Sequence, residues 1–166
     1  RLTELTYGVP SDLKTIFGYM AYMLKAVEML PSSHPVQIEA QYDGGEYKGK
    51  ALMFFLAMTN SVGGLEQLVP DASLNDGNFT MIIVKTGNVF EVLQLITKAL
   101  NGGRHIDDNR IVYKKTKNFP IVPKTGRKMP INLDGEFGGN APMKFTNLKQ
   151  HIQIFANLKN KKLTDQ

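Results

Sequence analysis

Residues 51–58, ALMFFLAM, are apolar at every position, and this stretch limits the possible folds more than any other. It is strand-sized and too short to cross a bilayer, which takes about 18–20 apolar residues. A half-buried strand alternates apolar and polar side chains, whereas a strand that is apolar throughout has both faces covered. The sequence therefore predicts a sheet that carries a second layer.

The residues before this stretch predict a hairpin. Residues 36–42 alternate apolar and polar side chains, as in a strand with one wet face. Asp43-Gly44 then supplies the left-handed backbone that a tight turn needs. The partner strand is expected to run from Glu46 into the apolar stretch that ends near Met58.

Two further segments predict helices, residues 11–30 and 88–100. The first has apolar residues at a spacing of three and four and stops at Pro31. The second begins with Asn88 as a cap and Glu91 in the capping-box position.

Strands outnumber helices, and short loops favour antiparallel pairing. The remaining strands are expected at residues 79–85, 110–117, 119–122, 129–133 and 150–155. We expect a mainly β (α+β) fold, a two-layer antiparallel β-sandwich-like domain with two flanking helices. With 166 residues and 42% hydrophobic content, residues 1–166 are long enough for one domain with its own core.

Composition excludes several classes of protein. Without cysteine there is neither a disulfide framework nor a thiolate metal site, which fits a cytoplasmic protein. The scattered histidines lack the spacing of a zinc site. The chain begins at Arg1 without a start methionine or a signal sequence, which predicts a segment of a longer protein.

The formal charge of +5 favours an anionic partner. An acidic lipid surface and nucleic acid both qualify, and a plain solvated surface is an equal alternative. The basic stretches lack interleaved aromatic residues for base stacking, so nucleic acid is not expected as a partner.

The best candidate for chemistry is a pair of carboxylates, Asp134 and Glu136, around Gly135 at the expected tip of a strand. Neither has a lysine or arginine next to it in the sequence. A carboxylate held near a hydroxyl can take its proton. The alternative is an ordinary polar turn, because Asp-Gly pairs mark turns.

A second candidate is the turn Asn75-Asp76-Gly77, within residues 70–79. Such a turn can present a carboxylate beside exposed backbone carbonyls, and Mg²⁺ prefers these hard oxygen ligands. Asp71 is close enough in the sequence to be an alternative ligand. An unliganded turn explains the same residues.

Residues 59–64, residues 70–79 and Leu133-Asp134-Gly135-Glu136, in this order and at these separations, resemble the C-terminal half of soluble bacterial diacylglycerol kinases. The likeness extends to related lipid kinases, including sphingosine kinases, and more distantly to NAD kinases. It runs along almost the whole chain. The family's Gly-Gly-Asp-Gly-Thr nucleotide loop does not occur here.

The resemblance implies a C-terminal, substrate-side domain whose N-terminal nucleotide-binding domain is absent from this chain. ATP, bound mainly by that absent domain, would phosphorylate the free hydroxyl of diacylglycerol to give phosphatidic acid. Glu136 would be the general base. Asp76, with the backbone carbonyls of Ser73 and Asn78, would bind a structural Mg²⁺.

Further expectations follow from the same resemblance. The enzyme would be cytoplasmic, attached peripherally to an anionic membrane and able to form a homodimer. The chain alone would be inactive. Two alternatives stay open: a lipid kinase with another alcohol acceptor, or a non-catalytic module that binds lipid or membrane.

Overall fold

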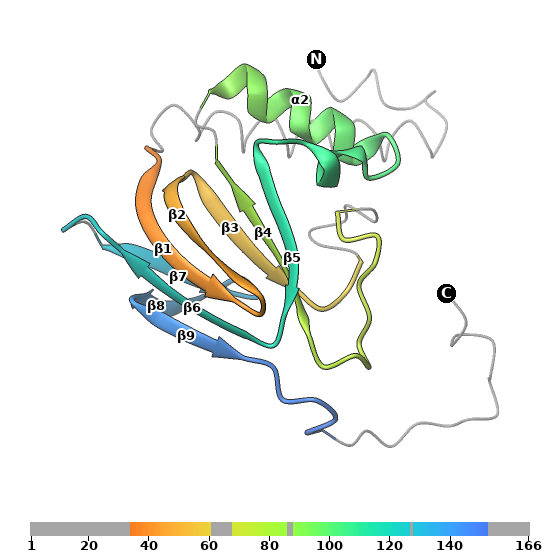
Figure 1. The fold of residues 1–166 in the computed structure, drawn as a ribbon, viewed down its shortest axis with the longest axis vertical. Coiled ribbons are helices and arrows are strands. Elements are labelled where there is room, and N and C mark those ends of the chain that lie inside the picture. Colours follow the sequence, from red (N-terminus) through yellow and green to blue (C-terminus); the bar gives the residue numbers. More distant parts are fainter. Residues whose placement is uncertain (1–33, 61–67, 86–87, 127, 153–166) are drawn as a thin grey trace, which may run out of the picture.

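The structure, a computed structural model, describes residues 34–60, 68–85, 88–126 and 128–152 (Figure 1). The helix expected over residues 11–30 lies outside them. The elements are β1 (Val36–Tyr42), β2 (Gly45–Ala51), β3 (Met53–Ala57), β4 (Phe79–Val84), helix α2 (Val89–Leu100), the 3₁₀ helix η3 (Arg104–Asp107), β5 (Ile111–Thr116), β6 (Asn118–Pro123), β7 (Met129–Leu133), β8 (Glu136–Ala141) and β9 (Met143–Thr146).

The strands form two packed layers and a hairpin, all with antiparallel pairing. One sheet has the order β2-β1-β6-β9, the other β3-β4-β5, and β7 pairs with β8. A buried cluster joins the layers through Ile38 of β1, Met81 and Ile83 of β4, and Phe119 and Ile121 of β6. The expected β-sandwich-like fold is confirmed.

The hairpin between β1 and β2 forms as predicted. Gly44 adopts a φ of +89°, in the region that favours glycine. Asp43 also ties the turn to the rest of the domain: its N–H donates to Oγ1 of Thr116 (3.0 Å), and its carboxylate accepts the N–H of Lys117 (2.6 Å). The tip of this hairpin is therefore fixed to the connection between β5 and β6.

The strand expected from Glu46 to Met58 is in fact two strands, so that prediction is wrong. β2 ends at Ala51 in the four-stranded sheet, and β3 begins at Met53 in the three-stranded sheet. Between them, the N–H of Leu52 donates to the carbonyl of Val84 (2.8 Å). The chain crosses from one layer to the other here without a polar residue or a glycine to mark the break.

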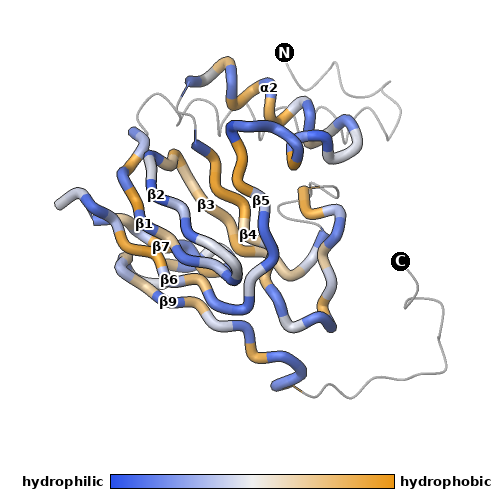
Figure 2. Tube along the Cα trace, in the orientation of Figure 1, coloured by the Kyte–Doolittle hydropathy of each residue, from blue (hydrophilic) through white to orange (hydrophobic). Residues whose placement is uncertain are grey.

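The expectation that both faces of the apolar strand are covered is confirmed for β3. Phe54 and Leu56 pack against the cluster between the sheets, while Phe55 and Ala57 belong to a second cluster with Val69 on the other face. Figure 2 shows hydrophobic colouring along the neighbouring β4 and hydrophilic colouring on β2. Apolar side chains thus cover both faces of the three-stranded sheet at β3.

Helix α2 confirms the second predicted helix and its cap. The side chain of Asn88 accepts the N–H of Phe90 (2.9 Å), and the N–H of Asn101 closes the last turn on the carbonyl of Thr97. The helix lies across the ends of β4 and β5 (Figure 1). No helix among the described residues is both long and apolar enough to cross a bilayer.

The strands expected near residues 79–85, 110–117, 119–122 and 129–133 are confirmed as β4 to β7. Two strands that follow, β8 and β9, were not predicted, because β8 contains two glycines and β9 is short. The strand expected at residues 150–155 does not begin where predicted: Gln150 lies in a turn with a φ of +52°. Residues 153–155 lie outside the described part.

His105 is a buried polar residue of η3, with 2% of its surface exposed. Its Nε2 lies 3.0 Å from the carbonyl oxygen of Leu68, to which it donates, and its Nδ1 has no partner among the described residues. Burial lowers the pKa of His105, while the hydrogen bond to Leu68 acts in the opposite direction. The folded protein therefore holds this ring neutral.

Because the pKa of buried His105 is lowered, we expect the folded protein to lose stability in mild acid. Because the folded protein binds this proton less readily than the unfolded chain, His105 stabilises the fold above the unfolded pKa of about 6.5, and the stabilisation is lost as the pH falls towards the folded pKa. For this one group, the free energy of unfolding changes by at most about 1.4 kcal/mol per pH unit. Urea unfolding at pH 7.5 and pH 5 should give a larger loss for the wild type than for His105→Gln. Equal losses would contradict the prediction, since His34 and His151 are exposed in both proteins.

Candidate functional site

Glu136 is the first residue of β8, directly after the turn of the β7–β8 hairpin. Leu133 and Glu136 are partners in the register, and the turn between them is Asp134 (φ +49°) and Gly135 (φ +101°). Positive φ at both positions is typical of the tightest hairpin turn, which favours an Asp-Gly pair. The side chain of Asn132 accepts the N–H of Gly135 (2.9 Å). The turn thus fixes the backbone at Glu136.

Glu136 is exposed, and within the described residues no ion pair or side-chain hydrogen bond reaches its carboxylate. Its neighbour on the same face is Leu133, because directly opposed residues share a face. A Cβ atom on Gly138 would lie 2.4 Å from Cγ of Leu133, so this leucine lies over the glycine. The carboxylate therefore lies beside an apolar side chain.

Two exposed apolar residues flank the turn: Leu133 is 49% exposed and Phe137 is 71% exposed. The face that carries Leu133 continues to Ile131, which is buried in the cluster between the sheets. The hairpin is thus anchored at its base and apolar beside its turn. Asp134 is exposed in the turn itself.

Asp76 lies in the loop before β4, and both of its carboxylate oxygens accept hydrogen bonds. Oδ1 accepts the N–H of Asn78 (2.8 Å), and Oδ2 accepts Nζ of Lys115 on β5 (2.9 Å). The hydrogen bond from Lys115, with that from the Asn78 backbone, lowers the pKa of Asp76. The side chain is therefore a carboxylate in any ordinary buffer.

Side chains of β5 also contact Asp71, the second carboxylate of this loop. The hydroxyl of Tyr113 donates to Oδ1 of Asp71, and Nζ of Lys115 lies 3.9 Å from Oδ2 of Asp71. Burial raises the pKa of Tyr113, and the hydrogen bond to Asp71 raises it further. Two carboxylates of the loop thus converge on a single ammonium group.

The donor atoms of this loop fit a hard divalent cation. The carboxylate of Asp76 is charged, and the side-chain amide of Asn78 donates to the main-chain oxygen of Asp76 (3.5 Å) within the same tight turn. Ser73 is in the same loop, where its hydroxyl accepts the N–H of Asn75 (3.4 Å). Among the described residues, however, no three His, Asp or Glu side chains gather closely enough to hold a metal by themselves. Main-chain oxygens and water would have to complete the coordination.

The two candidate regions are separate in the described structure. Asp76 and Asn78 come together in one turn, with Ser73 in the same loop, whereas Glu136 lies on the β7–β8 hairpin. No hydrogen bond or ion pair of the described residues joins the two regions. Sequence reasoning missed the place of Lys115 and Tyr113. Their alternation on β5 indicated a shared face, but no local signal named the loop that they contact.

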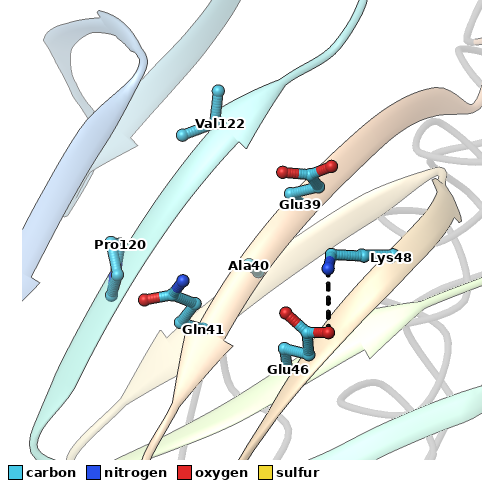
Figure 3. Close-up of a pocket in the computed structure, with 7 residues that line it drawn as sticks. All are labelled: Glu39, Ala40, Gln41, Glu46, Lys48, Pro120 and Val122. Atoms are coloured by element: carbon cyan, nitrogen blue, oxygen red, sulfur yellow. Dashed lines mark hydrogen bonds and ion pairs between the residues drawn. The ribbon is translucent and has the colours of Figure 1, made fainter.

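A shallow hollow lies on the outer face of the four-stranded sheet. None of its lining residues belongs to the Asp76 loop or to the β7–β8 hairpin. Its lining comes from β1, β2 and β6 and consists of Glu39, Ala40, Gln41, Glu46, Lys48, Pro120 and Val122 (Figure 3). Lys48 pairs with Glu46 across 2.9 Å, both largely exposed. An exposed pair of this kind is typical of a solvated sheet face and contributes little to binding or stability.

Comparison with known proteins places these features in a family. The family model described as "YegS C-terminal NAD kinase beta sandwich-like domain" matches residues 8–156. The diacylglycerol kinase of Bacillus subtilis strain 168 is 49% identical over 154 residues, which cover 93% of this chain and 50% of that relative. The diacylglycerol kinase of Staphylococcus carnosus strain TM300 is 44% identical over 168 residues, covering 100% of this chain and 54% of the relative.

Solved structures show the same fold. A crystal structure from Bacillus anthracis str. Sterne matches with a TM-score of 0.64 and 21% identity, covering 77% of this chain and 43% of that chain. The chain spans about half the length of the curated relatives it matches. On the match over residues 8–156 and these identities, the chain belongs to the family of YegS C-terminal NAD kinase β-sandwich-like domains.

Proposed function

We propose that this chain is the substrate-side domain of an ATP-dependent diacylglycerol kinase, with Glu136 as its general base. The observation that carries the proposal is the exposed carboxylate at the β7–β8 turn, which no cation of the described residues neutralises. Relatives at 44–49% identity bear the name diacylglycerol kinase. A second domain would supply most of the ATP site, since the chain spans only half of those relatives.

The chemistry of phosphoryl transfer assigns one task to Glu136. The oxygen of the acceptor hydroxyl forms a bond to the γ-phosphorus of ATP, the bond from that phosphorus to the β–γ bridging oxygen breaks, and ADP leaves. The hydroxyl proton passes to the Glu136 carboxylate as the new bond forms. A rigid turn that fixes the backbone at Glu136 favours this transfer, because a displaced base loses much of its effect.

The apolar surroundings of the turn favour a lipid acceptor. Leu133 presents exposed apolar surface beside the carboxylate, and Phe137 adds exposed apolar surface on the other face of the hairpin. An alcohol carried on apolar chains, such as diacylglycerol, would cover that surface, whereas a polar acceptor would leave it in water. Contact of basic residues with an anionic bilayer would bring the enzyme to its substrate, at about 1 kcal/mol for each lysine or arginine near the surface.

The Asp76 loop would hold Mg²⁺ through the Asp76 carboxylate and the main-chain carbonyls of Ser73 and Asn78. Bound there, the ion would supply positive charge that orders the loop. The donor types fit, because a charged carboxylate next to main-chain oxygens is the environment that Mg²⁺ uses in proteins.

A transfer assay tests the proposal. The complete two-domain protein, with radiolabelled ATP and a panel of lipids in mixed micelles, should label diacylglycerol in preference to phosphatidylglycerol or a sphingoid base. The chain of residues 1–166 alone should transfer nothing, because most of the ATP site is expected on the other domain. Labelling of another alcohol in place of diacylglycerol would replace the proposed substrate. No labelling of any lipid would favour a non-catalytic module that binds lipid. Full turnover by residues 1–166 would refute the proposed division into two domains.

A further inference from the structure

The ammonium group of Lys115 contacts the carboxylate that a cation at the Asp76 loop would use. Its Nζ is 2.9 Å from Oδ2 of Asp76 and 3.9 Å from Oδ2 of Asp71. The remaining oxygen of the Asp76 carboxylate already accepts the N–H of Asn78. An incoming ion would therefore find the free side of Asp76 covered by an ammonium group.

We infer that Lys115 is a built-in competitor for the divalent cation: its ammonium neutralises the loop without metal and has to leave Asp76 when metal binds. The inference rests on the metal site of the proposed function and assigns a role to a residue outside the ligand set. A single positive charge and a doubly charged ion cannot share one carboxylate oxygen at contact distance without strong repulsion. The two states of the loop are therefore exclusive.

The contacts of β5 suit such an exchange. Tyr113 and Lys115 lie two residues apart on the same face of the strand. Tyr113 donates to Asp71, while Lys115 donates to Asp76 and lies 3.9 Å from Asp71. The neutral Tyr113 hydroxyl can keep Asp71 in place after Lys115 has moved, because a phenol does not repel a metal ion. The lysine side chain is 35% exposed, so it has room to turn towards water, and its flexible stem permits that movement.

The test measures metal affinity instead of activity. Binding of Mn²⁺ to the chain, followed by electron paramagnetic resonance, and the Mg²⁺ dependence of Tm should be compared for the wild type, Lys115→Met and Lys114→Met. We expect Lys115→Met to bind the metal roughly two- to fivefold more tightly and to have a lower Tm without metal, since both changes follow from removal of one ion pair. Lys114 is exposed on the opposite face of the same strand, so Lys114→Met should match the wild type.

A second measurement uses the unaltered protein. The amine of Lys115 should react faster with acetic anhydride at saturating Mg²⁺ than without metal, with Lys114 as the internal reference in the mass spectrum. Unchanged Lys115 reactivity during metal binding, or equal affinity in the wild type and Lys115→Met, overturns the competition and leaves the Mg²⁺ site standing. Loss of metal binding in Asp76→Asn confirms where the ion binds. If neither the wild type nor any variant binds Mn²⁺ or responds to Mg²⁺, both the Mg²⁺ site and the competition by Lys115 are wrong. Transfer to diacylglycerol is tested separately, by the transfer assay.

Discussion

Replacing Glu136 by Gln in the complete two-domain protein is expected to lower the turnover number by about 10²- to 10⁴-fold, the range that a general base contributes. Gln keeps the shape of the side chain and removes its ability to take the acceptor proton. The affinity for lipid should change little, because the apolar side chains of Leu133 and Phe137 stay in place. Initial rates at saturating ATP and diacylglycerol would measure the effect.

The fold should not respond to this change. Glu136 is exposed, and no described side chain pairs with its carboxylate, so its substitution should alter the free energy of unfolding by less than about 0.5 kcal/mol. Glu46→Gln is the matched control: it removes an exposed glutamate from another hairpin, where it pairs with Lys48. Equal turnover in the wild type and Glu136→Gln would exclude Glu136 as the base.

Asp134→Asn separates the two carboxylates of the turn. Asn tolerates the left-handed backbone at this position (φ +49°), so the hairpin should keep its geometry. If Asp134 only orients the loop, its substitution should cost much less than that of Glu136. A large loss in Asp134→Asn together with normal turnover in Glu136→Gln would exchange their roles.

Local chemistry explains the features that were predictable from the sequence. Asp43-Gly44 and Asp134-Gly135 demand left-handed backbone, and Asn88 offers an oxygen to a free helix N–H, whatever the rest of the chain does. These positions could therefore be read from a few neighbouring residues. Glu136 was found in the same way, because its turn and its family motif are both local.

The features that were missed depend on contacts between distant parts of the chain. At Leu52 the sequence stays apolar on both sides of the break, and only pairing with Val84 shows that a new sheet begins. The glycines of β8 argue against a strand until β7 lies beside it. Lys115 reaches Asp76 across 39 positions of the sequence, so no local pattern could have assigned it to the candidate metal loop.

Substitution of Asp108 by Asn is expected to lower the free energy of unfolding by about 2–3 kcal/mol, because charged groups would lose a buried partner. The Asp108 side chain is 4% exposed and accepts Nε and an NH₂ nitrogen of Arg110 (both 2.8 Å) and Nζ of Lys98 (2.6 Å). It joins the end of α2, the residues after η3 and the start of β5. Urea unfolding at pH 7 would measure the loss. Asp107→Asn removes an exposed carboxylate one position earlier and should stay within about 0.5 kcal/mol of the wild type.

The same carboxylate should determine much of the acid sensitivity of the fold. The hydrogen bond from Arg110, with a further contribution from Lys98, holds the pKa of Asp108 well below its usual range. Because the folded pKa is depressed, the stabilisation is complete above the unfolded value of about 3.9 and is lost as the pH falls below it. The wild type should therefore lose more stability between pH 5 and pH 2 than Asp108→Asn, which has no proton to bind at this position. Only a carboxylate that stays charged in the fold gives the wild type a steeper fall of the free energy of unfolding with pH. If the two proteins show parallel pH profiles, Asp108 instead holds the helix to the sheet by packing alone.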